Sequence, residues 1–359
     1  MDHPIHVTRP SLAPIDDLVK YLETIWETGI MTHNGPLVQQ LEKELCSYLG
    51  VKNVVCVANG TSALQLSLRA LNLTGEVITT PFTFIATANI ISWEHCRPVF
   101  VDINPETWNI DVSQIEEKVS GLTSAILPVH VFSAPCDVAQ IQAIASRNGL
   151  KVIYDAAHAM ATNLQDSSVL NHGDISALSF HATKLFNTVE GGACVTNDDA
   201  LAERVRRMRF FGFDSEKEIV DEGMNAKMTE VSAGLGLANL KYLDQVRSNR
   251  REKYLLYRNL LSDRGFLKFQ KYNSEEYNYS YLPVLFESEE ILLKIKERLE
   301  SNNIFPQRYF YPSLNTISIF QPQTVLPVAE RVAKTVLCLP LFDTLPSESI
   351  DKICGWINI

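Results

Sequence analysis

The sequence predicts an α/β protein whose mainly parallel sheet is covered by helices on both faces. Between residues 53 and 196, short apolar runs typical of buried strands alternate with helical segments, a pattern typical of parallel sheets. The 359 residues exceed one ordinary domain. We therefore expect a large domain over residues 1–240 and a smaller carboxyl-terminal α/β domain over residues 241–359, on which the amino-terminal segment could pack.

Composition restricts the class of protein. Apolar residues make up 46% and charged residues 21% of the chain, as in soluble globular proteins. The net charge of −10 argues against binding to nucleic acid or to an anionic membrane surface. The seven cysteines show no metal or disulfide spacing, and the sequence begins without a signal segment. These features predict a cytoplasmic protein with reduced thiols and no metal site.

The first elements are helices. We expect one over residues 15–26 and a second from Pro36 up to Gly50, because proline suits a first helical position and glycine ends a helix. A strand over 53–58 then leads through Asn59-Gly60-Thr61-Ser62 into a helix over 63–71. The N–H groups that begin this helix suit a phosphate. The same motif also fits a simple helix capped by Thr61 or Ser62.

The next strand, over residues 76–80, is followed by Phe84 and a helix that ends at Ser92. An aromatic ring in this place can stack on a flat ligand or belong to the core. Three more strands end near Asp102, His130 and Asp155, and helices over 112–119 and 138–147 separate them. His130 is equally compatible with a core histidine and a sugar-binding residue.

The segment from Lys151 to Thr196 carries the chemistry. One apolar strand ends in Asp155, and His158 follows; the next strand, 175–180, ends just before His181 and Lys184. Either Asp155 or Lys184 alone would be read as a helix cap or a surface lysine. Together, at neighbouring strand ends, they are the pair that pyridoxal phosphate requires. A carboxylate keeps the pyridine nitrogen protonated, and a lysine forms a Schiff base with the aldehyde.

The rest of the chain continues with helices. A helix over 198–208 ends among four arginines, which we expect on a solvated or interface face. One long or slightly bent helix over 229–261 is expected to lead into the smaller domain. There we expect a strand over 279–286, helices over 289–301 and 347–356, and a loop, RYFYPSLN, over 308–315.

The segment Ser179-Phe180-His181-Ala182-Thr183-Lys184, with Glu190-Gly191-Gly192 after it, resembles the DegT/DnrJ/EryC1/StrS sugar aminotransferases, a branch of the fold-type I pyridoxal-phosphate enzymes. The resemblance extends over nearly the whole chain. It implies a mostly parallel seven-stranded sheet in the large domain. It also implies a cofactor site formed by Gly60, Thr61, Ser62, Phe84, Asp155, His158, Ser179, Lys184 and Asn225.

The resemblance assigns roles to these residues. Lys184 is the catalytic Schiff-base lysine, and Asp155 is the partner of the pyridine nitrogen. Phe84 and His158 lie at the cofactor ring, and Ser179 joins the helix start at Gly60 in holding the phosphate. Asn225 matches an asparagine that reaches the cofactor of the neighbouring subunit, which implies a homodimer with shared active sites. Three residues depart from the family pattern: Leu185, Lys227 and Ser133 stand where Asn, Arg and Gly are common.

The implied reaction is transamination of a nucleotide-linked keto-deoxysugar with glutamate as donor, in lipopolysaccharide O-antigen or related glycan biosynthesis. The segments HVFSAPCD, SFHATKLF and RYFYPSLN resemble the subgroup that aminates dTDP-linked 4-keto-6-deoxyhexoses. A 3-keto isomer is the next candidate. Candidate substrate residues are His130, His181, Glu190, Arg308, Tyr309 and Tyr311, although the last three could instead lie in a rim loop that packs on the dimer.

Two rival functions are weighed on the same fold. A sugar dehydratase would replace the lysine with histidine, and this chain keeps Lys184. A catalytically silent, cofactor-binding regulatory protein would not need Asp155, Lys184 and Asn225 together.

Overall fold

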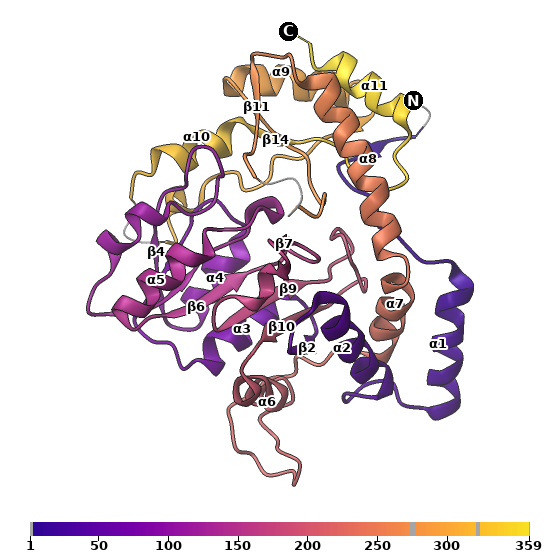
Figure 1. The fold of residues 1–359 in the computed structure, drawn as a ribbon, viewed down its shortest axis with the longest axis vertical. Coiled ribbons are helices and arrows are strands. Elements are labelled where there is room, and N and C mark those ends of the chain that lie inside the picture. The colour runs from indigo at the N-terminus through magenta and orange to yellow at the C-terminus, as the bar shows by residue number, and fades with distance from the viewer. Residues whose placement is uncertain (1–2, 273–276, 321–323, 359) are drawn as a thin grey trace.

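A seven-stranded sheet forms the centre of the larger part of the molecule (Figure 1). The computed structural model describes residues 3–272, 277–320 and 324–358. The strand order is β2-β10-β9-β6-β5-β3-β4, and only β10 runs antiparallel to its neighbours. The mostly parallel sheet is therefore confirmed. Its strands are β2 (Asn53–Val57), β3 (Glu76–Thr79), β4 (Arg97–Phe100), β5 (Thr123–Leu127), β6 (Lys151–Asp155), β9 (Ile175–Ser179) and β10 (Gly192–Thr196).

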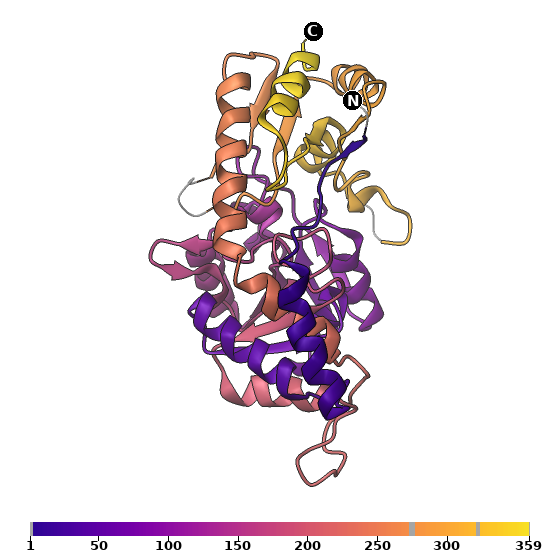
Figure 2. The same cartoon turned by 90° about the vertical axis from the view of Figure 1, so that its right-hand side faces the viewer.

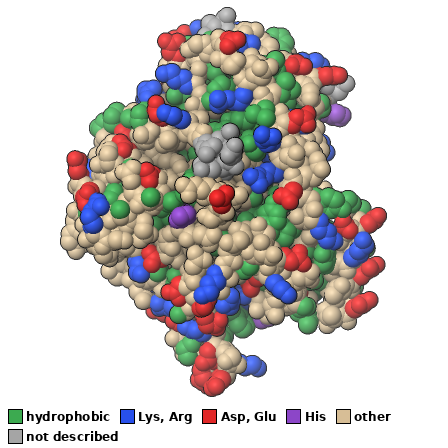
Figure 3. Space-filling view, in the orientation of Figure 1, with side chains coloured by type: hydrophobic (Ala, Val, Ile, Leu, Met, Phe, Trp, Pro, Cys, Tyr) green, Lys and Arg blue, Asp and Glu red, His purple; other side chains and the backbone are tan. Residues whose placement is uncertain are grey.

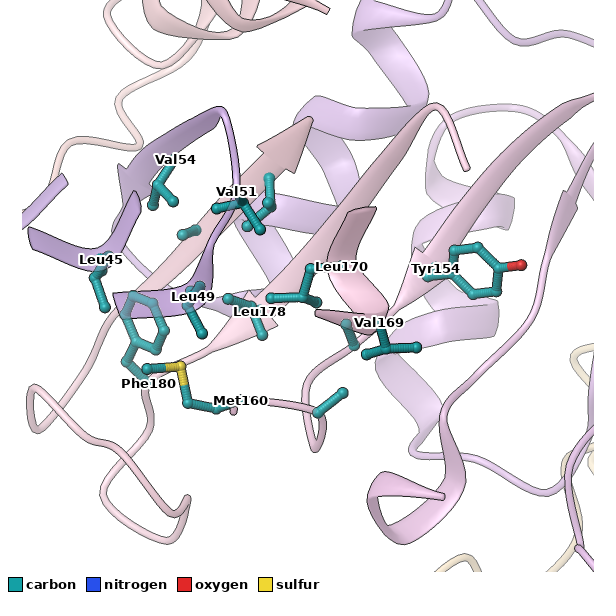
Figure 4. Packing of buried hydrophobic residues seen from close by; sticks show 14 of the residues in the cluster. Leu45, Leu49, Val51, Val54, Tyr154, Met160, Val169, Leu170, Leu178 and Phe180 are labelled. Carbon is teal, nitrogen blue, oxygen red and sulfur yellow. The ribbon is translucent and has the colours of Figure 1, made fainter. Parts of the chain in front are cut away.

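Helices cover both faces of this sheet because alternate residues of each strand point to opposite sides. Val54 and Cys56 of β2 belong to one buried cluster, whereas Val55 and Val57 belong to the other. The first cluster includes residues of α1 (Ile15–Thr28), α2 (Pro36–Leu49), α5 (Val138–Asn148) and α7 (Glu230–Leu240); part of it is drawn in Figure 4. The second includes residues of α3 (Gly60–Ala70), α4 (Ile85–Trp93) and α6 (Asp199–Met208).

The predicted helix boundaries hold where proline or glycine marks them. Pro36 begins α2, and Gly50 follows it in the left-handed conformation with φ of 61°. By contrast, α3 begins three residues earlier than expected, at Gly60. Asn59, rather than Thr61 or Ser62, is its cap, because the Asn59 side chain accepts a hydrogen bond from the Ser62 N–H. Gly60, Thr61 and Ser62 therefore form the first turn of the helix.

The helix expected over 112–119 is wrong. The segment forms two short 3-10 turns, Val112–Gln114 and Glu116–Lys118. The Asp111 carboxylate accepts hydrogen bonds from the side chains of Ser113 and Gln114 and holds the start of the segment in a tight turn. Ile115 is its one fully buried residue, so little apolar burial favours a longer helix.

The single helix expected over 229–261 is also wrong, because the chain forms α7 and then α8 (Leu243–Leu261). The break lies at Lys241 and Tyr242, where Tyr242 has φ of −108° and ψ of 2°. The Tyr242 hydroxyl donates to the Asp17 carboxylate of α1 at 2.7 Å. Helix α7 lies beside the sheet and packs against α1 and α2, whereas α8 extends into the upper part of the molecule (Figures 1 and 2). The division into a large domain over residues 1–240 and a small domain over residues 241–359 stays a prediction.

The upper part is built around a three-stranded antiparallel sheet in the order β11-β12-β14. These strands are β11 (Leu267–Phe269), β12 (Pro283–Phe286) and β14 (Val336–Cys338), and they pack with α8, α9 (Glu289–Glu300) and α11 (Ser347–Trp356) around a buried cluster. The strand expected from residue 279 begins only at Pro283, because Tyr279 has φ of 60° and cannot continue a strand.

Several short elements complete the chain. Strand β1 (Ile5–His6) pairs in parallel with β13 (Ile304–Phe305), so the amino-terminal segment lies along the upper part (Figure 2). Strands β7 (Asn163–Leu164) and β8 (Ser167–Ser168) form a small hairpin. The sequence did not predict helix α10 (Pro327–Thr335), whose first N–H groups, at Val328 and Ala329, bind the Asp102 carboxylate.

Acidic and basic side chains are interspersed over most of the face seen in Figure 3. Not one of the described helices combines the length and the apolar character that a bilayer crossing requires.

Candidate active site

A cavity of about 330 Å³ opens at the carboxyl ends of β6 and β9. Parallel strands deliver their last residues to one edge of the sheet, so ligands of such folds bind there. Residues of the upper part, Tyr309 and Phe310, close the other side. The cavity is lined by Asn59, Gly60, Thr61, Leu64, Thr83, Phe84, Ala86, Val129, Asp155, Ala157, His158, Ser179, His181, Thr183, Lys184, Glu190, Tyr309 and Phe310.

Lys184 lies on the turn that follows β9, where its backbone N–H donates to the carbonyl of His181 at 2.9 Å. Its side-chain Nζ lies 3.2 Å from the hydroxyl of Tyr281. Burial lowers the pKa of the Lys184 amine to about 8, although the nearby Asp155 carboxylate opposes the shift. An unprotonated amine is therefore accessible near neutral pH, which a nucleophile or a proton carrier requires.

Asp155 ends β6 and is buried, with 5% of its surface exposed. Its Oδ2 accepts a hydrogen bond from the Thr87 hydroxyl at 2.7 Å, and its Oδ1 accepts one from the Ala157 N–H at 3.1 Å. Burial raises the pKa of Asp155, while these two hydrogen bonds and the Lys184 charge oppose the rise. The carboxylate is thus held in one orientation and suits a partner that carries a proton.

Two rings line the same cavity. His158 is buried, and its Nδ1 accepts the N–H of Phe132 at 3.2 Å. Burial, assisted by the Lys184 charge, lowers the His158 pKa well below its usual value, so the ring is neutral and Nε2 carries its proton. Phe84 precedes α4 and is 63% exposed. An aromatic face that is both exposed and on a cavity wall can stack on a flat ligand.

The start of α3 lies against the end of β9 at the edge of the cavity. The first N–H groups of a helix have no partner within the helix, and Gly60 and Thr61 line the cavity at this point. A Cβ on Gly60 would lie 2.9 Å from the Ser179 Cβ, and a Cβ on Gly192 would lie 2.6 Å from the Asn59 carbonyl carbon. Only glycine at these positions lets helix, strand and Ser179 form one cradle, which suits a phosphate.

These residues fit pyridoxal phosphate. The cradle would hold the phosphate, Asp155 would face the ring nitrogen, Phe84 and His158 would contact the ring, and Lys184 would meet the aldehyde. Ser62 does not line the cavity, because both its N–H and its hydroxyl bind Asn59 Oδ1, at 2.8 Å and 3.0 Å. It would hold the cradle in shape.

His181 and Glu190 lie at the cavity, where both side chains are largely exposed. The Nδ1 of His181 accepts the Thr183 N–H at 3.2 Å, and its Nε2 lies 3.6 Å from Glu190 Oε1. The two side chains can therefore present one donor and one acceptor to a polar ligand.

Three of the predicted substrate residues, His130, Arg308 and Tyr311, lie outside the cavity lining. His130 is fully buried, accepts the Cys136 N–H at 3.1 Å through Nδ1 and stacks on Tyr154 with 4.6 Å between ring centroids. Of its two readings, the core histidine therefore agrees with the geometry. Arg308 binds Glu289 at 2.6 Å and lies over the Tyr311 ring, 3.7 Å from its centroid.

Asn225 is exposed and lies outside the cavity of its own chain; its Oδ1 accepts a hydrogen bond from Lys227 Nζ at 2.5 Å. The other two departures from the family pattern, Leu185 and Ser133, are buried. They do not line the cavity.

Sequence reasoning missed Thr83, Thr87, Tyr281 and Phe310. Thr87 and Tyr281 reach Asp155 and Lys184 from distant parts of the chain. A threonine within a helix carries no distinctive signal. The tyrosine-rich run over 277–281 was the one available sign of an unusual segment.

The whole chain is similar to several known proteins. The model of the DegT/DnrJ/EryC1/StrS aminotransferase family matches residues 15–358. A dTDP-4-amino-4,6-dideoxy-D-glucose transaminase of Shigella dysenteriae is 43% identical, and the match covers 100% of this chain and 99% of the relative. A transaminase of the same name from Escherichia coli is 40% identical over 98% of this chain and 97% of its own. The crystal structure of DesI with its TDP-sugar product has a TM-score of 0.95 at 33% identity and covers 99% of this chain and 93% of DesI.

Proposed function

Because the chain belongs to the DegT/DnrJ/EryC1/StrS aminotransferase family, whose members depend on pyridoxal phosphate, we propose that this enzyme aminates dTDP-4-keto-6-deoxy-D-glucose at carbon 4. The observation that carries the sugar assignment is the 43% identity, over the full chain, to a dTDP-4-amino-4,6-dideoxy-D-glucose transaminase. The donor we propose is glutamate. The product would serve lipopolysaccharide O-antigen or related surface glycans, and the enzyme would act in the cytoplasm.

When bound, pyridoxal phosphate supplies an aldehyde for amine exchange and a ring that stabilises negative charge beside the reacting carbon. The Asp155 carboxylate would hold the proton on the ring nitrogen. Gly60, Thr61 and Ser179 would hold the phosphate in the cradle. Phe84 would keep water from one face of the ring.

Lys184 moves the proton. With glutamate bound, Nζ of Lys184 would take the proton from the donor α-carbon and deliver it to carbon C4′ of the cofactor. With the ketosugar bound, the same nitrogen would move a proton in the reverse direction, from C4′ to carbon 4 of the sugar. A pKa of about 8 suits this role, because a useful fraction of the amine is unprotonated near neutral pH.

The sugar would lie toward His181, Glu190 and Tyr309, which line the cavity. The ion pair of Arg308 with Glu289 at 2.6 Å fixes the loop that carries Tyr309 and Tyr311. His130 is not included in this sugar site, because it is enclosed in the core.

We further propose a homodimer with shared sites. The support is the position of Asn225, which is exposed and lies outside the cavity of its own chain. A twofold dimer would bring the same side chain to the partner's cofactor phosphate, twice in each assembly.

The decisive experiment is incubation of the purified enzyme with pyridoxal phosphate, glutamate and dTDP-4-keto-6-deoxy-D-glucose, with product detection by mass spectrometry and NMR. We expect an amine on carbon 4. An amine on carbon 3, from the isomeric 3-keto sugar, overturns the position. If no dTDP-ketosugar yields a product, the sugar assignment fails. If glutamate does not change the visible spectrum of the enzyme, a silent cofactor-binding protein is favoured instead.

A further inference from the structure

Among the hydrogen bonds of the described residues, the shortest contact of the Lys184 amine is with the side chain of Tyr281. Its hydroxyl lies 3.2 Å from Lys184 Nζ, and only 6% of the residue is exposed. Lys184 follows β9 in the larger part of the molecule, whereas Tyr281 precedes β12 in the upper part. The contact therefore joins the two parts of the molecule.

The backbone around Tyr281 is fixed from two sides. The hydroxyl of Tyr277 donates to the Tyr281 carbonyl at 2.7 Å. The guanidinium of Arg250, in α8, donates to the carbonyls of Ser280 and Leu341, each at 3.2 Å. Arg250 is itself buried, with 1% of its surface exposed. A buried cation that binds the preceding carbonyl limits the movement of the phenol.

The segment is also tied to the large part of the molecule through Asn278. The Asn278 amide donates to the carbonyls of His158 and Met160, at 2.7 Å and 2.8 Å. The ring of Tyr281 packs on the ring of His158 with 4.5 Å between centroids. The phenol is thus held relative to the same strand end that carries Asp155.

The chemistry of a phenol suits this contact. Burial raises the pKa of Tyr281, against the effect of the Arg250 charge, so the hydroxyl stays neutral. A neutral hydroxyl can accept a hydrogen bond from a protonated amine and donate one to a free amine. The other titratable groups around Lys184 are Asp155, which raises its pKa, and His158, which is neutral.

We propose that Tyr281 is a positioning residue for the transamination, whose hydroxyl holds the free amine of Lys184 in line with the carbon atoms between which it moves the proton. The proposal rests on the proposed function, because it assumes that Lys184 moves a proton. Tyr281 gains and loses no proton in the cycle. Its hydroxyl only changes from donor to acceptor when Nζ takes up the proton from carbon, and back again when Nζ releases it.

The test is the Tyr281→Phe variant of the holoenzyme, with Tyr257→Phe as the matched control. Tyr257 is also fully buried, but lies in the core of the upper part. In single-turnover reactions with glutamate we expect Tyr281→Phe to slow conversion about tenfold to hundredfold, which is less than the roughly 10²–10⁴-fold contribution of a general acid or base, because Tyr281 only positions the amine. Deuterium on the glutamate α-carbon should slow the variant more than the wild type, because proton transfer becomes rate-limiting. Cofactor affinity should stay within about twofold.

A second measurement uses the protein without cofactor. The pH dependence of Lys184 acylation, followed by peptide mass spectrometry, gives the pKa of the amine directly. We expect Tyr281→Phe to lower it below the wild-type value of about 8, because the buried ammonium loses an acceptor and charge-assisted hydrogen bonds are the stronger ones. Tyr257→Phe should leave it unchanged. A Tyr281→His variant, which keeps a hydrogen-bonding ring, should recover part of the rate.

The outcomes separate the possibilities. An unchanged Lys184 pKa together with an unchanged single-turnover rate overturns the proposal. So does weaker cofactor or glutamate binding with an unchanged isotope effect, which would mean a purely structural role. If the wild type does not react with glutamate at all, the proposed donor is wrong, yet the acylation measurement still decides whether Tyr281 holds the amine.

Discussion

The hydroxyl of Thr87 donates a hydrogen bond of 2.7 Å to Asp155 Oδ2 in the interior of the protein. Thr87 is fully buried in α4, and Asp155 ends β6. The bond opposes the rise in the Asp155 pKa that burial causes. A residue with no direct place in the cavity lining therefore keeps the carboxylate charged and correctly oriented for the cofactor.

Replacing Thr87 with valine should weaken cofactor binding. The variant keeps the shape of the side chain but removes the donor, so the Asp155 pKa should rise further. Hydrogen bonds to charged groups contribute about 1.5–3 kcal/mol, so we expect a loss of affinity of about tenfold to hundredfold. Titration of the apoprotein with pyridoxal phosphate, followed by absorbance, measures this directly.

The matched control is Thr79→Val. Thr79 is also fully buried, and its hydroxyl also makes a 2.7 Å hydrogen bond, but to the carbonyl of Leu127 within the sheet. It should lower stability without changing cofactor affinity. Equal affinities of the two variants would show that the Thr87 hydroxyl does not act through Asp155.

We expect the purified enzyme to be yellow, and replacing Lys184 with alanine should abolish this visible absorbance band, together with transamination. The band requires the covalent link between the lysine and the cofactor, with Asp155 maintaining the protonated ring. The fold should persist, because Lys184 lies on a cavity wall. Absorbance spectra, circular dichroism and an amine-transfer assay measure the three properties. Turnover at the parental rate would disprove the lysine assignment.

The pH dependence of apoprotein stability should reveal the buried amine. The folded-state pKa of Lys184 is lowered from 10.5 to about 8. A lowered pKa means that the neutral form is favoured in the folded state. The stability that the neutral lysine contributes is therefore present above pH 10.5 and is lost as the pH falls through about 8. Near pH 7 the wild type has lost this stabilisation completely.

A Lys184→Met variant lacks the charge and should be more stable than the wild-type apoprotein at pH 7, on the order of 2 kcal/mol. The advantage should shrink as the pH rises above 8. Urea denaturation across this pH range gives both curves. Parallel curves for the two proteins would mean that the Lys184 pKa is not lowered by folding.

The sequence was most informative where a strand ends. Asp155 and Lys184 follow apolar runs long enough to identify β6 and β9, and the rule that ligands bind at the carboxyl ends of parallel strands brings the two residues together without any structure. Proline and glycine also identified the two ends of α2, because each has a conformational preference of its own.

Contacts between distant segments were beyond the reach of these patterns. Arg209 was expected on a solvated or interface face, yet it is buried and donates to the carbonyl of Cys56. At the break between α7 and α8, Tyr242 contacts Asp17 of the distant helix α1. Tyr281 meets Lys184 from a distant segment whose backbone turns at Tyr279, where φ is 60°. Local propensity encodes none of these relationships.

Replacing Gly60 with alanine should disrupt the phosphate cradle. The new Cβ would lie 2.9 Å from the Ser179 Cβ, so the start of α3 and the end of β9 must move apart. We expect affinity for pyridoxal phosphate to fall about tenfold or more, since hydrogen bonds to the phosphate are lost. Gly121→Ala is the control, because nothing lies within 4 Å of its added Cβ. Unchanged affinity in Gly60→Ala would place the phosphate elsewhere.

The last prediction concerns the shared site, and it uses heterodimers purified through two different affinity tags. One subunit carries Lys184→Ala and the other Asn225→Ala, each inactive as a homodimer. If Asn225 reaches across, one site of the heterodimer combines the intact Lys184 of one chain with the intact Asn225 of the other, and the second site has lost both. Activity should then be about half of the wild-type value, because a twofold dimer has two equivalent sites. If Asn225 serves its own chain, each site lacks one residue and the heterodimer stays inactive. A fully active monomer in light scattering would contradict the shared site altogether.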